Sequence, residues 1–151
     1  MGGAYKIEAR DASYIEVQYT STPVASNTGI RITTLYDNSS MLFLDGAVDQ
    51  LNVRDDSTAT LKGGTINSIR IYHLSSWLSE VVIYCQAGYT MDSTGISGLW
   101  ADGTSFDIDF IDVGGAFSAY PTYDYVEVVV IPEPTTISLL GIGSLLIRRK
   151  K

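Results

Sequence analysis

Apolar and polar residues alternate in short runs along the first half of the chain, and these runs repeat at a fixed distance. Residues 37–54 and 55–72 match one another at an offset of 18 residues. Within each copy the apolar positions lie two residues apart, which is the period of a β-strand and not of a helix. The pattern therefore predicts a repeated unit of short strands separated by turns rich in Asp, Asn and Gly. The matched pairs are Asp37 and Asp55, Ser39 and Ser57, Phe43 and Leu61, Gly46 and Gly64, Val48 and Ile66, Leu51 and Ile69, and Val53 and Ile71.

The repeat extends in both directions beyond these two copies. Upstream, Ile15 falls in the column of Met41, and the extra polar residues around 20–28 predict a surface loop between two repeats. Downstream the pattern weakens, and the 18-residue period aligns Trp77 with Met41. We therefore expect further copies of the unit on both sides of residues 37–72.

Short strands with a single apolar face cannot bury that face alone, but coiling stacks each copy on the last at about 4.8 Å and builds a continuous core. We predict an all-β fold in which residues 1–90 form a short β-solenoid with rungs of about 18 residues. A β-sandwich is the alternative, because strands at regular spacing also suit that fold.

The segment that follows departs from the period. Asp102 and Gly103 give a hairpin signal, after which Phe106, Ile108 and Phe110 alternate with polar residues. We expect residues 91–131 to form a terminal β cap that closes the open end of the solenoid, since uncovered strand edges invite aggregation.

The charge distribution divides the chain into two parts. The formal net charge is −7, but the last four residues are all cations, so residues 1–147 hold six cations and 17 acidic residues, a net charge of −11. A strongly acidic body repels nucleic acid, and we expect no nucleic-acid partner. The single cysteine, Cys85, allows no internal disulfide and no thiolate metal cluster.

Few side chains suggest chemistry. Stacking places Asp37 over Asp55, which could supply part of a calcium site, although Asx turns that cap their own backbone explain these residues more simply. The stripe of Asp107, Asp109 and Asp112 has the same two interpretations, a solvated strand face or a cation site. His73 occupies the turn column and is expected to face solvent. No acid–base pair or nucleophile emerges, so we predict no enzyme, no catalytic residue, no metal site and no cofactor, with calcium as the weak exception.

The last residues form three zones without spacers. Pro132 and Pro134 flank Glu133 in a segment that the prolines hold extended. An uncharged apolar run over 135–147 follows, for which we expect a single transmembrane helix. Such a helix covers only about 20 Å at 1.5 Å per residue, whereas a comfortable span needs about 20 residues. The chain ends in the basic cluster Arg148, Arg149, Lys150 and Lys151, which should lie on the cytoplasmic side of the membrane.

This order of zones resembles the PEP-CTERM sorting signal of bacteria that make extracellular polysaccharide. The resemblance covers residues 130–151 and assigns 132–151 to the signal. It implies that Pro132, Glu133 and Pro134 form the motif recognised by exosortase, a membrane transpeptidase-like protease. It also implies export, yet the first residues contain no basic n-region, apolar h-region or cleavage site. We therefore expect the N-terminal part to be truncated.

A sorting signal does not determine what the body does. The first hypothesis is a non-enzymatic structural protein of the cell envelope or extracellular matrix, anchored transiently in the membrane, processed by an exosortase-like enzyme and in contact with extracellular polysaccharide. The alternatives are a fragment of a solenoid carbohydrate-active enzyme and a calcium-dependent adhesin, each with the same signal. Clustered Asp with Lys or Arg on one solenoid face would favour the enzyme, and stabilisation by calcium would favour the adhesin.

Overall fold

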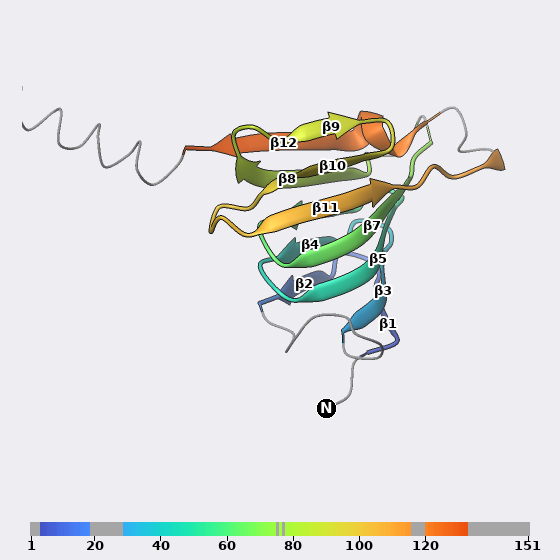
Figure 1. The fold of residues 1–151 in the computed structure, drawn as a ribbon. Coiled ribbons are helices and arrows are strands. Elements are labelled where there is room, and N and C mark those ends of the chain that lie inside the picture. The colour runs from blue at the N-terminus through green and yellow to red at the C-terminus, as the bar shows by residue number, and fades with distance from the viewer. Residues whose placement is uncertain (1–3, 19–28, 75, 77, 116–119, 133–151) are drawn as a thin grey trace, which may run out of the picture.

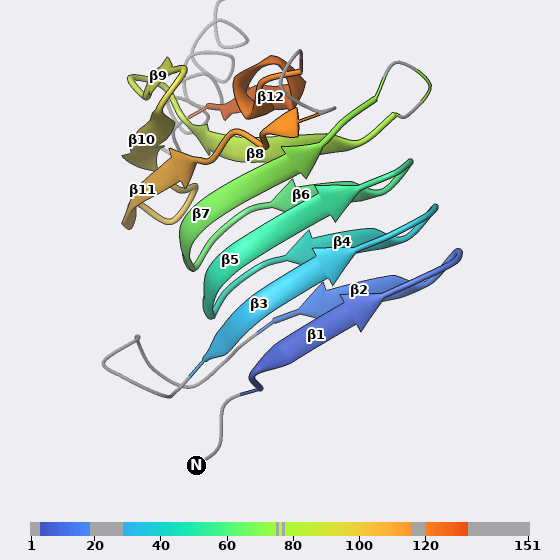
Figure 2. The ribbon, with the colours of Figure 1, turned by 90° about the vertical axis from the view of Figure 1, so that its right-hand side faces the viewer.

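The computed structural model describes residues 4–18, 29–74, 76, 78–115 and 120–132 (Figure 1). Two sheets face each other, and the chain passes from one to the other after each of the first strands (Figure 2). Four strand pairs follow in order and make about three turns, so the predicted all-β solenoid is confirmed. Sheet A begins with β1 (Lys6–Ala9), β3 (Ile30–Leu35), β5 (Ala47–Arg54) and β7 (Thr65–Tyr72); sheet B begins with β2 (Tyr14–Val17), β4 (Ser40–Phe43), β6 (Thr58–Leu61) and β8 (Glu80–Gln86).

The parallel register follows the 18-residue period in the middle of the solenoid. Val48 pairs with Ile66 between β5 and β7, and Met41 pairs with Ala59 between β4 and β6. The apolar columns point inward and form one core between the sheets. Its largest fully buried side chains include Phe43, Leu35, Leu51, Leu61, Ile69, Ile71 and Ile83. The alternation seen in the sequence is therefore the alternation between core and surface.

Two insertions interrupt the period. Ile15 pairs with Met41, as predicted, because the extra residues between β2 and β3 leave the strand register intact; residues 19–28 themselves lie outside the described part. Between β7 and β8 the chain is also longer, and Ala59 pairs with Val81, an offset of 22 residues. The expectation that Trp77 fills this column is wrong, because Val81 occupies it.

The C-terminal segment adds strands to both sheets. β11 (Ser105–Phe110) pairs in parallel with β7, and β12 (Val126–Ile131) pairs in parallel with β8. β10 (Gly95–Leu99) and β9 (Thr90–Asp92) turn back from β11 as antiparallel strands, which confirms the Asp102–Gly103 hairpin signal. A short 3-10 helix, η2 (Thr122–Tyr125), leads into β12. The top of the solenoid in Figure 1 is thus an extra strand on each sheet and a folded-back hairpin.

Two buried side chains attach this segment to the last solenoid rung. Trp100 is fully buried, packs on Phe106 with ring centroids 4.2 Å apart, and donates its indole N–H to the carbonyl of Gly64 at 2.8 Å. Thr122 is also fully buried, and its hydroxyl accepts the backbone N–H of Ile71 at 3.3 Å where β11 has diverged from β7. Both contacts satisfy polar groups that would otherwise be buried without partners.

The expected fold class is wrong in its last element, the C-terminal transmembrane helix. Among the described residues, no helix is long and apolar enough to cross a membrane. Residues 135–147, for which the helix was expected, lie outside the described part of the chain. In the sequence, this run is shorter than the roughly 20 residues that a comfortable span needs.

Candidate functional site on the outer face of sheet A

The parallel register lines up outward-facing side chains of sheet A in three columns that run across the strands. Because alternate residues of a strand point to the same face, each rung contributes one residue to each column. Lys6 and Glu8 lie on β1 and Arg10 directly follows it, and the same three columns continue through β3, β5 and β7, with Tyr36 directly after β3. The columns are Lys6, Ile32, Gln50 and Ser68; Glu8, Thr34, Asn52 and Arg70; and Arg10, Tyr36, Arg54 and Tyr72.

The third column alternates cations with aromatic rings, and we call Arg10, Tyr36, Arg54 and Tyr72 the Arg–Tyr ladder. The Arg10 guanidinium lies 4.2 Å from the centre of the Tyr36 ring. Arg54 lies between the two rings, 5.2 Å from Tyr36 and 4.5 Å from Tyr72. These distances are those of cation–π contacts. The ladder holds long side chains in fixed positions along one side of the sheet.

The middle column is a polar layer that is largely withdrawn from solvent. Thr34 and Asn52 are buried, with 4% and 7% of their surface exposed. The Asn52 amide donates to the Thr34 hydroxyl at 3.3 Å and accepts from the Gln50 amide at 2.7 Å. These bonds fix the orientation of the amide groups beside the ladder.

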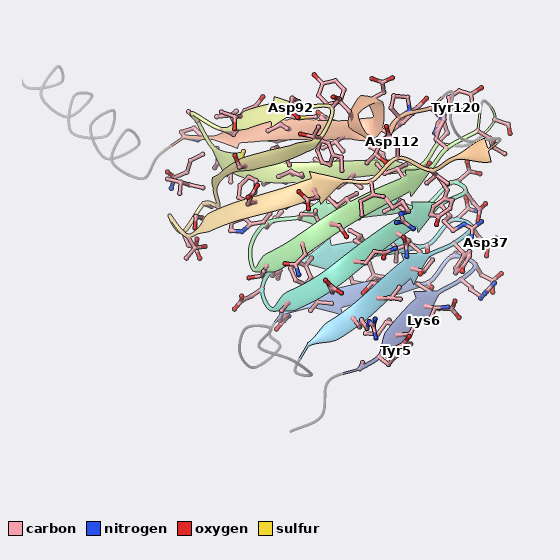
Figure 3. The ribbon with its side chains drawn as sticks, turned by 45° about the vertical axis from the view of Figure 1, so that its right-hand side comes forward. Tyr5, Lys6, Asp37, Asp92, Asp112 and Tyr120 are labelled. Atoms are coloured by element: carbon pink, nitrogen blue, oxygen red, sulfur yellow. The ribbon has the colours of Figure 1, made fainter. Side chains whose placement is uncertain are left out.

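A groove of about 200 Å³ lies over these columns. Its walls combine cations, tyrosine rings, an amide and a hydroxyl. Figure 3 shows this face, with Lys6 on β1 and Asp37 at the corner of the rungs. The lining residues are Lys6, Ile32, Thr34, Tyr36, Asn52, Arg54 and Tyr72.

The charges of this face are only partly neutralised. Glu8 pairs with Lys6 at 2.6 Å and with Arg10 at 3.8 Å. The hydrogen bond between Lys6 and Glu8 raises the pKa of the lysine and lowers the pKa of the glutamate. Within the described part of the chain, Arg54 and Arg70 take part in no ion pair, and the Nε atom of each is buried without a hydrogen-bond partner.

The stacked aspartates at the corner of the rungs have a structural role. Asp11, Asp37 and Asp55 all adopt positive φ angles of 55° to 58°. The Asp37 carboxylate accepts the backbone N–H of Asp11 at 3.1 Å, and the Asp55 carboxylate accepts that of Asp37 at 3.2 Å. We call this series the Asp staircase. The predicted stacking is confirmed, but the carboxylates cap the neighbouring rung and not their own turn.

No group of three acidic, His or Cys side chains that could hold a metal ion occurs among the residues described here. Asp107 and Asp109 are exposed on β11 and line a second groove together with Asp92. Asp112 accepts the backbone N–H of Thr122 at 2.9 Å and so helps to seat η2 (Figure 3). The aspartate stripe is therefore divided between a strand surface and a loop contact.

His73 does not face solvent, contrary to expectation. It is 8% exposed and stacks on the Tyr125 ring, with centroids 3.7 Å apart, while Tyr120 lies 5.4 Å away. Its Nδ1 atom is hydrogen-bonded to Ser79 at 3.3 Å. Burial lowers the pKa of the imidazole. The turn column is covered at this rung because the η2–β12 segment packs over it.

The residues of the sorting motif lie at the end of the described chain. Pro132 is exposed and directly follows β12. Glu133, Pro134 and the basic cluster Arg148, Arg149, Lys150 and Lys151 lie outside the described residues.

Comparison with protein-family models, curated proteins and solved structures finds no match to this chain.

Proposed function

We propose that the chain is an exported structural protein of the cell envelope or extracellular matrix, and that an exosortase-like enzyme sorts and processes it at the membrane through Pro132, Glu133 and Pro134. The observation that carries the proposal is the position of the motif. β12 pairs along its whole length with β8 up to Ile131, and Pro132 follows as an exposed residue. The motif therefore begins where the last strand ends.

The body suits a display role without catalysis. Parallel ladders join the stacked rungs in both sheets, and its apolar columns form one continuous core. Stacking of this kind makes each rung support its neighbours. The acidic surface keeps such a rigid body soluble and separate from other acidic chains. A passive role outside the cell requires these properties and no active site.

The proposal is tested by following the C-terminal tail in a host that contains exosortase. An antibody against residues 140–151 reports whether the tail remains on the protein. We expect the tail to disappear from the wild-type chain and to remain on a Glu133→Gln variant, because the substitution removes the charged centre of the motif. Glu127→Gln on β12 is the matched control, since it removes the same charge six residues earlier and should leave processing unchanged. Tail removal that is equal in all three proteins would refute the assignment of the motif.

A further inference from the structure

Positive charge gathers on one face of an otherwise acidic body. Residues 1–147 carry a net charge of −11 with only six cations, and four of these, Lys6, Arg10, Arg54 and Arg70, belong to the columns of sheet A. From β1 to β7, Glu8 is the single carboxylate in these columns, and Asp109 extends the first column onto β11 beside Ser68. Since the body as a whole repels anions, a local cluster of cations is a feature that requires an explanation.

Two of these cations have no counter-ion in the part of the chain that the structure describes. Both ion pairs seen in the described residues use Glu8, and they engage Lys6 and Arg10. Arg54 and Arg70 are half-buried, and the Nε–H group of each lacks an acceptor. A half-buried guanidinium without a counter-ion is unfavourable, and an incoming carboxylate would relieve this by a charge-assisted contact with the accessible part of the group, since the Nε atom itself is buried. The ladder already holds Arg54 in position between two tyrosine rings, which reduces the entropy lost on binding.

The rest of the groove suits a ligand rich in hydroxyl groups. Thr34 and Asn52 form a polar base of the groove beside Arg54, where they are 4% and 7% exposed and hydrogen-bonded to each other. Tyr36 and Tyr72 add ring surface with a polar end. Parallel strands place successive rungs about 4.8 Å apart across the sheet, so a linear polymer of small units that lies across the strands can contact several rungs at once.

We infer that the groove on sheet A binds a linear polysaccharide that carries carboxylates, with Arg54 in the groove and Arg70 beside it, paired with Asn52 across β5 and β7, as the carboxylate-binding residues. This inference deepens the proposed function, on which it rests for the location of the protein beside such a polymer. The tyrosine rings of the groove contact the sugar rings. Binding requires no covalent step and leaves the ligand unchanged.

The test is calorimetric titration of the purified full-length chain with sodium polygalacturonate and with the same polymer methyl-esterified, which removes the charge and keeps the sugar backbone. We expect binding of the acid form that weakens as salt rises, and binding of the ester weaker by about tenfold or more, because charged hydrogen bonds are lost. Arg54→Gln should weaken binding of the acid form to a similar degree. Arg54→Lys keeps the charge without the planar fork and should fall between wild type and Arg54→Gln.

Lys62→Gln is the matched control. Lys62 stacks on Tyr84, 4.8 Å from its ring centre, but it belongs to the β6 side of the molecule and not to the groove. This variant loses one cation and one cation–π contact outside the groove, so it should keep full affinity for the acid polymer. Circular dichroism checks that each variant is folded; if Arg54→Gln is not, Arg70→Gln replaces it.

Three results would overturn the inference. Equal affinity for the acid and ester forms would show a neutral glycan surface, and equal affinity for poly-glutamate would show a general polyanion surface. Absence of binding to all of these probes would remove the site altogether. Because the titration uses purified protein, none of these results depends on sorting, and a chain that is processed by exosortase but does not bind would leave the proposed function standing.

Discussion

Replacement of Asp37 measures how much the Asp staircase contributes to the solenoid. Asp37 does two things at once: its backbone has a φ of 56°, and its carboxylate accepts the N–H of Asp11 on the neighbouring rung. Three substitutions separate these effects. Asp37→Ala loses both, Asp37→Gly loses only the hydrogen bond, and Asp37→Asn keeps an acceptor and a side chain that tolerates the left-handed region.

The magnitudes follow from the geometry. The left-handed conformation costs an alanine about 1 kcal/mol, and loss of one exposed inter-rung hydrogen bond costs about 1 kcal/mol. We therefore expect Asp37→Ala to lower the free energy of unfolding by about 2 kcal/mol, which for a chain of this size lowers the Tm by roughly 4–8 °C. Asp37→Gly should cost about half as much, and Asp37→Asn less than about 1 kcal/mol.

The assay is thermal and urea unfolding, followed by far-ultraviolet circular dichroism as the signal of the β-sheets. The slope of the urea transition should be the same for all variants. Asp107→Ala provides the control, because Asp107 is an exposed aspartate whose φ is not positive. It should change stability by less than about 0.5 kcal/mol. The reasoning is refuted if Asp37→Ala matches this control, or if glycine is the worst of the three residues at position 37.

Three further predictions concern the last rung and the pH dependence. Burial lowers the pKa of His73, so the folded protein favours the neutral imidazole. This stabilisation is complete above the unfolded pKa of about 6.5 and is lost as the pH falls through the lower pKa of the folded state. His73→Phe should therefore make the free energy of unfolding depend less on pH between about pH 7 and pH 5. Trp100→Phe leaves the Gly64 carbonyl without its 2.8 Å donor and should cost about 2 kcal/mol in urea unfolding. Gly64→Ala would place a Cβ 2.7 Å from the carbonyl oxygen of Gly46 at a φ of 75°, and should lower the free energy of unfolding by more than about 2 kcal/mol. Gly88 has a φ of 90° but open space around it, so Gly88→Ala is the control and should cost only about 1 kcal/mol.

The repeat made much of the fold predictable from the sequence. Phe43 and Leu61 lie 18 residues apart in the chain and pair directly in sheet B, because a period of this length with alternating apolar residues has one simple way to bury its inner face. The same period contained the Arg–Tyr ladder, since Tyr36, Arg54 and Tyr72 are also separated by 18 residues. This signal was missed because outward positions differ in residue type from copy to copy, and only the register shows that they are in contact.

The remaining features depend on tertiary contacts that no local pattern encodes. The longer connection after β7 shifted β8 by four residues relative to the 18-residue period, so Val81 and not Trp77 fills the core column. His73 occupies a turn column that is exposed at Asp37 but covered at its own rung by Tyr125, which is distant in sequence. The 18-residue period does not predict the structure at the end of the repeat array, because the residues that cover the last rung differ from those of the internal repeats.

The central claim, that the chain is exported and sorted through its C-terminal motif, is tested most directly by the mass of the mature protein. The gene is expressed from its natural locus in the exosortase-containing host and in the same host without the enzyme, and intact-mass spectrometry is applied to the protein recovered outside the cell. The account predicts a product outside the cell that ends near Pro134 only when the enzyme is present. A product that retains Arg148 to Lys151 in both hosts would contradict it.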